Sequence, residues 1–125
     1  MSDEIQILYV EDEPSIAKLL ASGLDLFGIS VKPIYMSAEA LIQAWDQPEI
    51  QRADLLIFDI RLPGMTGLEL ATKLRGQGEK RPLVLVSAWP RPDQSELAAI
   101  QAEFIAKPFD FSDVVQTIQK LVNRS

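Results

Sequence analysis

The sequence contains no cysteine and no histidine among its 125 residues. This excludes disulfides, thiol nucleophiles, metal sites with thiolate or imidazole ligands, and a Ser-His-Asp arrangement. No apolar run approaches the roughly 18 residues of a membrane span, and the N-terminal stretch MSDEIQ is acidic, unlike a secretory signal. We therefore expect a cytoplasmic protein whose chemistry depends on carboxylates, hydroxyls, lysine and arginine.

Basic residues are in the minority, with 12 Lys and Arg against 18 Asp and Glu and a net charge of −6. This charge disfavours attraction to nucleic acid and to anionic membranes, so we predict neither as a direct partner. A hydrophobic share of 47% with 24% charged residues is typical of a globular protein. The length suits one hydrophobic core and therefore one domain.

Five short runs rich in apolar residues predict strands, at 5–10, 30–35, 55–59, 83–87 and 103–106. Helical patterns follow them over 14–27, 38–45, 68–74, a short segment after Asp93, and 110–122. Expected helix starts are Pro14, Ser37, and the pairs Thr66 with Glu69 and Asp93 with Glu96. The alternation predicts an α/β fold: a five-stranded parallel sheet with helices on both faces.

Polar side chains follow the predicted strands at the edge where such sheets bind ligands. They are Glu11 and Asp12, Asp59, Ser87 and Lys107. Each alone has an ordinary structural explanation, as a cap, a turn residue or solvated surface. Together, three carboxylates without histidine favour a hard cation, and Mg²⁺ suits oxygen ligands best.

The same set of residues suits phosphoryl transfer. A carboxylate can attack phosphorus and form an acyl phosphate. Catalysis of that step is mainly positioning and charge neutralisation, which a metal ion, a lysine and a hydroxyl supply.

Four motifs carry a family resemblance: ILYVEDEP, FDIRLPGMTGLEL, VLVSA and FIAKPF, which occur in this order along essentially the whole chain. The sequence resembles the receiver domain of two-component response regulators. The resemblance implies a doubly wound, flavodoxin-like fold in which a βα unit occurs five times. It also implies a single receiver domain over residues 3–123, with no second domain in this chain.

The resemblance assigns a role to each residue at the sheet edge. Asp59 is the phosphoacceptor, and Glu11, Asp12, Asp59 and the main-chain carbonyl of Arg61 hold Mg²⁺, for which Mn²⁺ can substitute. Ser87 hydrogen-bonds the phosphoryl group and Lys107 pairs with it. The Lys107–Pro108 bond matches the family's cis peptide.

The resemblance further implies a signalling switch in a two-component or phosphorelay system. The phosphoryl group would come from a histidine kinase or a phosphotransfer protein, and the chain would catalyse only its own phosphorylation and dephosphorylation. Ser87 would then move toward the phosphoryl oxygens and Phe104, at the switch-aromatic position, would turn inward. Homodimerisation on phosphorylation is a further expectation, and the downstream effector is left open.

The sequence departs from the family pattern between Ser87 and Lys107, where about two residues are missing and the helix or its loop should be short. Trp89 in SAWPRPDQ is either a lid or partner contact, or an aromatic packed over the shortened loop. In many receivers the output face is the surface formed by the fourth helix, the fifth strand and the fifth helix. We expect this face to be used differently here. The aromatic residues Trp45, Phe109 and Phe111 are predicted to pack in or over the core, and Arg75, Lys80 and Arg81 to form a solvated loop.

Two other functions fit a strand-end aspartate less well. Haloacid-dehalogenase-like phosphohydrolases resemble D-x-D, but Arg61 stands where their second acid would protonate a leaving group. A flavin-binding module would place phosphate after the first strand, where Glu11, Asp12 and Glu13 would repel it.

Overall fold

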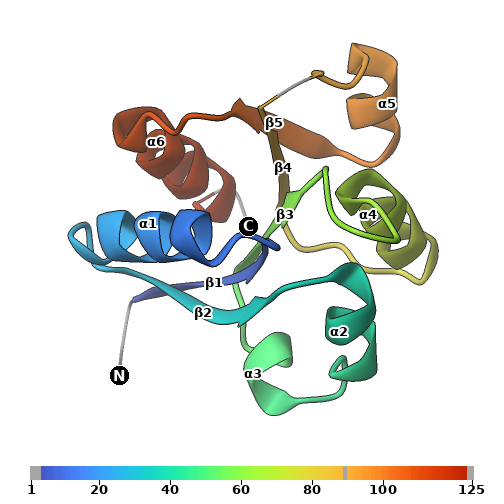
Figure 1. Cartoon of the computed structure of the whole chain (residues 1–125), viewed down its shortest axis with the longest axis horizontal. Coiled ribbons are helices and arrows are strands. Elements are labelled where there is room, and N and C mark those ends of the chain that lie inside the picture. The colour runs from blue at the N-terminus through green and yellow to red at the C-terminus, as the bar shows by residue number, and fades with distance from the viewer. Residues whose placement is uncertain (1–3, 89, 124–125) are drawn as a thin grey trace.

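The computed structural model describes residues 4–88 and 90–123, which contain one sheet of five parallel strands (Figure 1). The strands are β1 (Ile5–Val10), β2 (Ile29–Tyr35), β3 (Leu55–Asp59), β4 (Leu83–Ser87) and β5 (Ala102–Ala106). Their order in the sheet is β2-β1-β3-β4-β5. The strand order reverses direction beside β1, as expected of a doubly wound sheet, so the predicted fold class is confirmed.

Helices cover both faces of the sheet (Figure 1). They are α1 (Pro14–Asp25), α2 (Ala38–Gln43), α3 (Pro48–Gln51), α4 (Gly67–Gly76), α5 (Gln94–Ala99) and α6 (Phe111–Val122). Helices α1 and α6 pack on one face, and α2 to α5 pack on the other. The single-turn helix α3 was not predicted from the sequence. Helix α5 has six residues and is short, as predicted.

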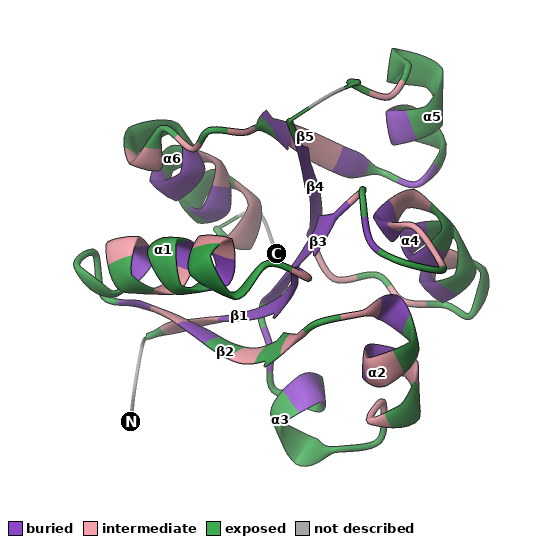
Figure 2. Cartoon of the chain, viewed as in Figure 1, coloured by how far each residue is buried: buried purple, intermediate pink, exposed green. Residues whose placement is uncertain are grey.

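Two apolar clusters, one on each side of the sheet, form the core. Along β1, Leu8 and Val10 belong to the cluster under α2 to α5, and Ile7 and Tyr9 to the cluster under α1 and α6. This alternation follows from the two-residue period of a strand. Figure 2 shows the buried residues concentrated on the strands and on the inward faces of the helices.

The expected helix starts are confirmed. Ser37 accepts a hydrogen bond from the Ala40 N–H at 3.0 Å, and Thr66 and Glu69 form a reciprocal capping box. The first helix is shorter than predicted and ends at Asp25. There the Phe27 N–H donates to the Leu24 carbonyl, a bond of the tighter three-residue spacing that closes a helix.

The expectation that Arg75 and Arg81 lie in a solvated loop was wrong. The Arg75 guanidinium donates to the carbonyls of Glu79, Arg81, Ile100 and Gln101. Arg81 pairs with Glu79 at 2.8 Å, and donates to the carbonyls of Ile50 and Ala53. Carbonyl groups at helix ends lack intrahelical partners, and a forked guanidinium can satisfy several at once. Lys80 is exposed, as predicted.

Three aromatic residues outside the sheet pack over the core, as predicted. Trp45 packs against one apolar cluster and lies 5.8 Å from the guanidinium carbon of Arg81. Phe109 and Phe111 pack against the other cluster, with their ring centroids 6.4 Å apart. These three side chains therefore have structural roles.

Candidate functional site

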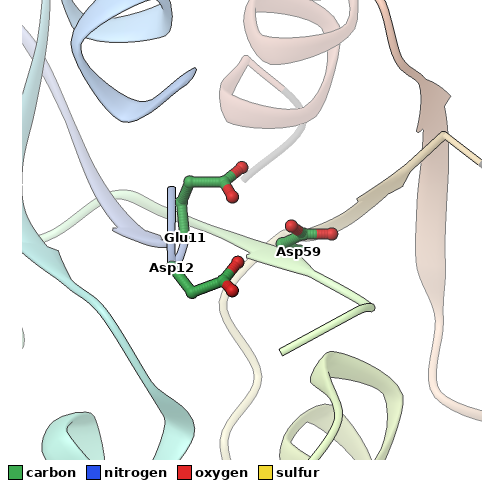
Figure 3. Close-up of side chains that lie close together, drawn as sticks. All are labelled: Glu11, Asp12 and Asp59. Carbon is green, nitrogen blue, oxygen red and sulfur yellow. The ribbon is translucent and has the colours of Figure 1, made fainter. Parts of the chain in front are cut away.

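The ends of four strands bring the predicted polar residues to one edge of the sheet. Glu11 follows β1, Asp59 ends β3, Ser87 ends β4 and Lys107 follows β5. Figure 3 shows the carboxylate groups of Glu11, Asp12 and Asp59 close together. One oxygen from each of these three side chains lies within 4.8 Å of the others. The sequence therefore placed the acidic cluster correctly.

Backbone hydrogen bonds fix these strand ends relative to one another. The Ile60 N–H donates to the Val86 carbonyl at 2.9 Å, and the Lys107 N–H donates to the Ser87 carbonyl at 3.0 Å. The Glu11 N–H donates to the Tyr35 carbonyl at 2.9 Å. The side chains therefore project from a rigid edge, which suits preorganised chemistry.

The charged groups of the cluster are mostly buried. Glu11 is fully buried, Asp59 is 4% exposed, and Asp12 is half-buried. The Lys107 ammonium group binds both buried acids, with Nζ 2.7 Å from Oε1 of Glu11 and 2.9 Å from Oδ2 of Asp59. Burial by itself lowers the pKa of Lys107, but the hydrogen bonds and charges of Glu11 and Asp59 outweigh it and raise that pKa. Lys107 is therefore held in its charged form.

A buried tyrosine belongs to this network and was missed from the sequence. The Tyr9 hydroxyl donates to Oε1 of Glu11 at 2.8 Å. Burial, followed by the charge and hydrogen bond of Glu11, raises the pKa of Tyr9 far above its ordinary value, so the hydroxyl stays a donor. Tyr9 and Glu11 are two positions apart along an extended segment, and this spacing is the signal that could have revealed the contact.

The loop between β3 and α4 is held close to Asp59. Gly67 packs so tightly against the Asp59 carbonyl that a Cβ atom there would overlap it. Gly64 adopts a φ of +73°, a conformation that favours glycine. The Glu39 carboxylate from α2 reaches this loop and accepts the Met65 N–H at 3.0 Å. The sequence did not single out Glu39.

A cleft of about 550 Å³ opens beside the carboxylates. Its lining residues come from the ends of β1, β3, β4 and β5 and from the first turn of α1: Asp12, Glu13, Ile16, Asp59, Arg61, Ala88, Lys107 and Pro108. The Lys107–Pro108 peptide bond is cis, as the resemblance implied. The buried nucleophile candidate, Asp59, therefore borders a space that a small phosphorylated compound could enter.

The donor set fits a divalent cation with a preference for oxygen. Three carboxylates converge, and one ammonium group, that of Lys107, contacts two of them. Their mutual repulsion is therefore incompletely balanced by Lys107. Oxygen donors at this spacing suit Mg²⁺ and would suit Mn²⁺, because both are hard cations.

The predicted switch residues lie on β4 and β5, the two strands to one side of β3, with Ser87 at the same sheet edge as Asp59 and Phe104 further back on β5. Ser87 is buried at the end of β4, and its Cα pairs in register with that of Ala106 on β5. Phe104 is two positions earlier on β5, half-buried, and packs against the apolar cluster under α2 to α5. Trp89, the other residue singled out in this region, lies outside the described residues.

Comparison with known proteins identifies the family. A model of the response regulator receiver domain matches residues 7–119. The chain belongs to this receiver family. Its helices, within residues 4–88 and 90–123, include none long and apolar enough to cross a membrane.

Relatives and solved structures agree with this assignment. The chain is 31% identical to the phosphate regulon transcriptional regulatory protein PhoB of Rhizobium meliloti, over 96% of this chain and 53% of that protein. It is 33% identical to the two-component response regulator PhoP of Pseudomonas aeruginosa, over 97% of this chain and 53% of that protein. The receiver thus spans about half the length of these curated relatives.

Among solved structures, the chain is similar to FixJ-N, with a TM-score of 0.81, 28% identity and coverage of 100% of this chain and 98% of that one. It is also similar to the chemotaxis response regulator CheY4 of Vibrio cholerae, with a TM-score of 0.77, 26% identity and coverage of 94% and 98%. Receivers of this family are signalling switches that typically bind Mg²⁺.

Proposed function

We propose that this chain is a phosphorylation-dependent switch that accepts a phosphoryl group on Asp59. The observation that carries the proposal is the buried Asp59 carboxylate, paired with Lys107 at 2.9 Å beside two further acids and an open cleft. We propose that Glu11, Asp12, Asp59 and the main-chain carbonyl of Arg61 hold Mg²⁺. When bound, Mg²⁺ supplies charge neutralisation for the transferred phosphoryl group.

The proposed chemical step is an in-line displacement. An Asp59 carboxylate oxygen forms a bond to phosphorus, while the bond from phosphorus to the donor's leaving group breaks and the leaving group departs with its electron pair. Lys107 contributes charge to the transferred oxygens, and Ser87 contributes a hydroxyl donor. Arg61 has no proton to give at neutral pH, which disfavours a phosphohydrolase that protonates its leaving group from this position.

The proposed response follows from the charge that the phosphoryl group adds, about −1.5 to −2. Ser87 turns toward the phosphoryl oxygens, and Phe104 moves into the space that it leaves. Phe104 lacks a hydroxyl, so its inward position needs burial and no hydrogen-bond partner. Replacement of Ser87 with alanine should therefore weaken both the phosphorylation of Asp59 and the response of the surface around Phe104.

The proposed donor is a histidine kinase or a phosphotransfer protein, and the proposed location is the cytoplasm.

We propose that residues 3–123 act as a single receiver domain that catalyses only its own phosphorylation and dephosphorylation. We also propose that phosphorylation promotes a homodimer. Direct contact with nucleic acid or a membrane is disfavoured by the net charge of −6.

The decisive experiment is incubation with acetyl phosphate and Mg²⁺, followed by intact mass measurement. Wild type should gain the mass of one phosphoryl group, and Asp59→Asn should gain none. Asp54→Asn is a matched control, because Asp54 precedes the same strand at its opposite end and accepts the Gln6 N–H there. The control should be phosphorylated as wild type is.

Either of two results would contradict the proposal: an adduct on Asp59→Asn equal to that of wild type, or no adduct on wild type. Omission of Mg²⁺ should slow the reaction of wild type strongly. An equal rate with and without the metal would contradict the proposed metal site alone.

A further inference from the structure

Tyr9 places a hydroxyl group inside an apolar cluster, where an aliphatic side chain or phenylalanine would fill the space without a polar atom. It is fully buried and packs in the cluster under α1 and α6. A buried hydroxyl costs free energy unless it has a hydrogen-bond partner. Its partner is Oε1 of Glu11, at 2.8 Å, and Glu11 is one of the three acids of the proposed metal site.

Glu11 receives donors on both carboxylate oxygens. Oε1 accepts from the Tyr9 hydroxyl and from Lys107 Nζ, and Oε2 accepts from the Glu13 N–H at 3.3 Å. The Tyr9 donor is part of the rigid strand β1, whereas the Lys107 donor is the end of a flexible side chain that is shared with Asp59. The two donors on Oε1 therefore differ in how easily they can leave.

Phosphorylation of Asp59 would change which oxygens the Lys107 ammonium group binds. A phosphoryl group brings additional negative charge to the Asp59 side of the shared ammonium group. Lys107 Nζ would then turn from Glu11 toward the phosphoryl oxygens. A fully buried carboxylate oxygen that loses its last donor is strongly unfavourable, so a second donor on Oε1 makes this movement easier.

We propose that Tyr9 is a positioning residue of the phosphorylation site: its hydroxyl fixes the Glu11 carboxylate and keeps Oε1 hydrogen-bonded when Lys107 moves to the phosphoryl group. This inference rests on the proposed function of Asp59. It adds a role for a core residue that does not line the cleft. The effect is specific to the phosphorylated state, because Lys107 Nζ also donates to Oε1 when Asp59 carries no phosphoryl group.

The test compares Tyr9→Phe with Tyr35→Phe, because these are the two tyrosines of the chain. The ligand is beryllium trifluoride with Mg²⁺, which imitates a phosphoryl group on a carboxylate, and its affinity is measured by calorimetry. Tyr9→Phe should bind it roughly tenfold more weakly than wild type and be phosphorylated by acetyl phosphate roughly tenfold more slowly. Tyr35→Phe should match wild type in both measurements.

A purely structural role predicts a different result. It would lower the thermal midpoint of Tyr9→Phe equally with and without beryllium trifluoride, and leave the affinity unchanged, which would overturn the inference. A second comparison uses Glu11→Ala, which removes the oxygen that accepts the Tyr9 hydroxyl. In that background, Tyr9→Phe should change the affinity much less than it does in wild type, and an undiminished change would also overturn the inference.

The proposed function and this inference can fail separately. If wild type neither binds beryllium trifluoride nor gains a phosphoryl group, the proposed function is wrong. If wild type does both and Tyr9→Phe does them equally well, the role of Tyr9 alone is wrong.

Discussion

The guanidinium carbon of Arg91 lies 5.3 Å from the centroid of the Phe104 ring, within the range of a cation–π contact. Arg91 belongs to the segment before α5, and Phe104 is the half-buried aromatic residue on β5 at the expected switch position. The short segment between β4 and α5 therefore contacts the proposed switch directly.

The first prediction concerns Arg91→Ala. If Phe104 must leave this contact to turn inward, removal of the guanidinium makes the inward position easier to reach. An exposed cation–π contact contributes about 0.5–1 kcal/mol, so the affinity for beryllium trifluoride with Mg²⁺ should rise roughly two- to fivefold. Calorimetry measures the change, with Arg52→Ala as a control for the loss of an exposed arginine. An unchanged affinity would show that this contact does not restrain Phe104.

The site was predictable from the sequence where the fold forces residues together. Asp59 and Lys107 each follow a predicted strand of a parallel sheet, and the carboxyl ends of neighbouring parallel strands lie at the same edge. Their convergence therefore needed only the strand positions, which the apolar runs gave with errors of one residue at β2 and β5. The same logic placed Glu11 and Ser87.

The contacts that were missed depend on how particular side chains reach across the fold. The Arg75 Nε donates to the carbonyl of Ile100, 25 residues away, and Glu39 accepts from the Met65 N–H, 26 residues away. In the sequence Arg75 resembles a solvated loop residue, and Glu39 resembles an ordinary surface charge on a helix. Their partners are main-chain groups, which every residue carries, so no residue type marks them.

The second prediction concerns Arg75→Lys. A lysine retains the positive charge but cannot donate to all four carbonyls as the guanidinium fork does. The variant should lose about 2 kcal/mol or more of its free energy of unfolding, because several partly buried carbonyls lose a charged donor. Urea unfolding measures this loss. The matched control is Lys73→Ala, two positions earlier on an exposed part of α4, which should change stability by less than about 0.5 kcal/mol.

The third prediction concerns Lys107→Met. The substitution keeps an unbranched side chain but removes the ammonium group that binds Glu11 and Asp59. Two buried carboxylates are then left to repel each other, and without metal the variant should lose at least about 1 kcal/mol of stability. Saturating Mg²⁺ should reduce this loss, because a cation bound by the same acids again balances their charge.

Thermal unfolding with and without Mg²⁺ measures both effects of Lys107→Met. Lys120→Met is the control, since the exposed Lys120 Nζ lies 3.9 Å from a Glu103 oxygen in a surface pair of small expected value. A loss of stability for Lys107→Met that is the same in both conditions would argue against metal binding by Glu11 and Asp59.

The fourth prediction concerns the pH dependence of the Glu39 contact. The hydrogen bond from the Met65 N–H lowers the pKa of Glu39 in the folded chain. A carboxyl group whose pKa is lower in the folded state stabilises that state fully above its unfolded pKa, about 4.3. This stabilisation is lost as the pH falls from there through the folded pKa. Wild type should therefore be more stable than Glu39→Ala at pH 7, and the difference should shrink below about pH 4.3.

Two further variants make the Glu39 prediction specific. Glu39→Gln keeps an oxygen acceptor for the Met65 N–H without a titrating charge, so its stability relative to Glu39→Ala should not shrink over the same pH range. Glu49→Ala removes another exposed glutamate, from α3, and serves as the control in urea unfolding at each pH. If the Glu39 and Glu49 variants followed the same pH profile, general loss of negative charge would explain the result. A profile confined to Glu39 instead shows that its carboxylate holds the loop after Asp59, because protonation weakens the acceptor of the Met65 N–H in that loop.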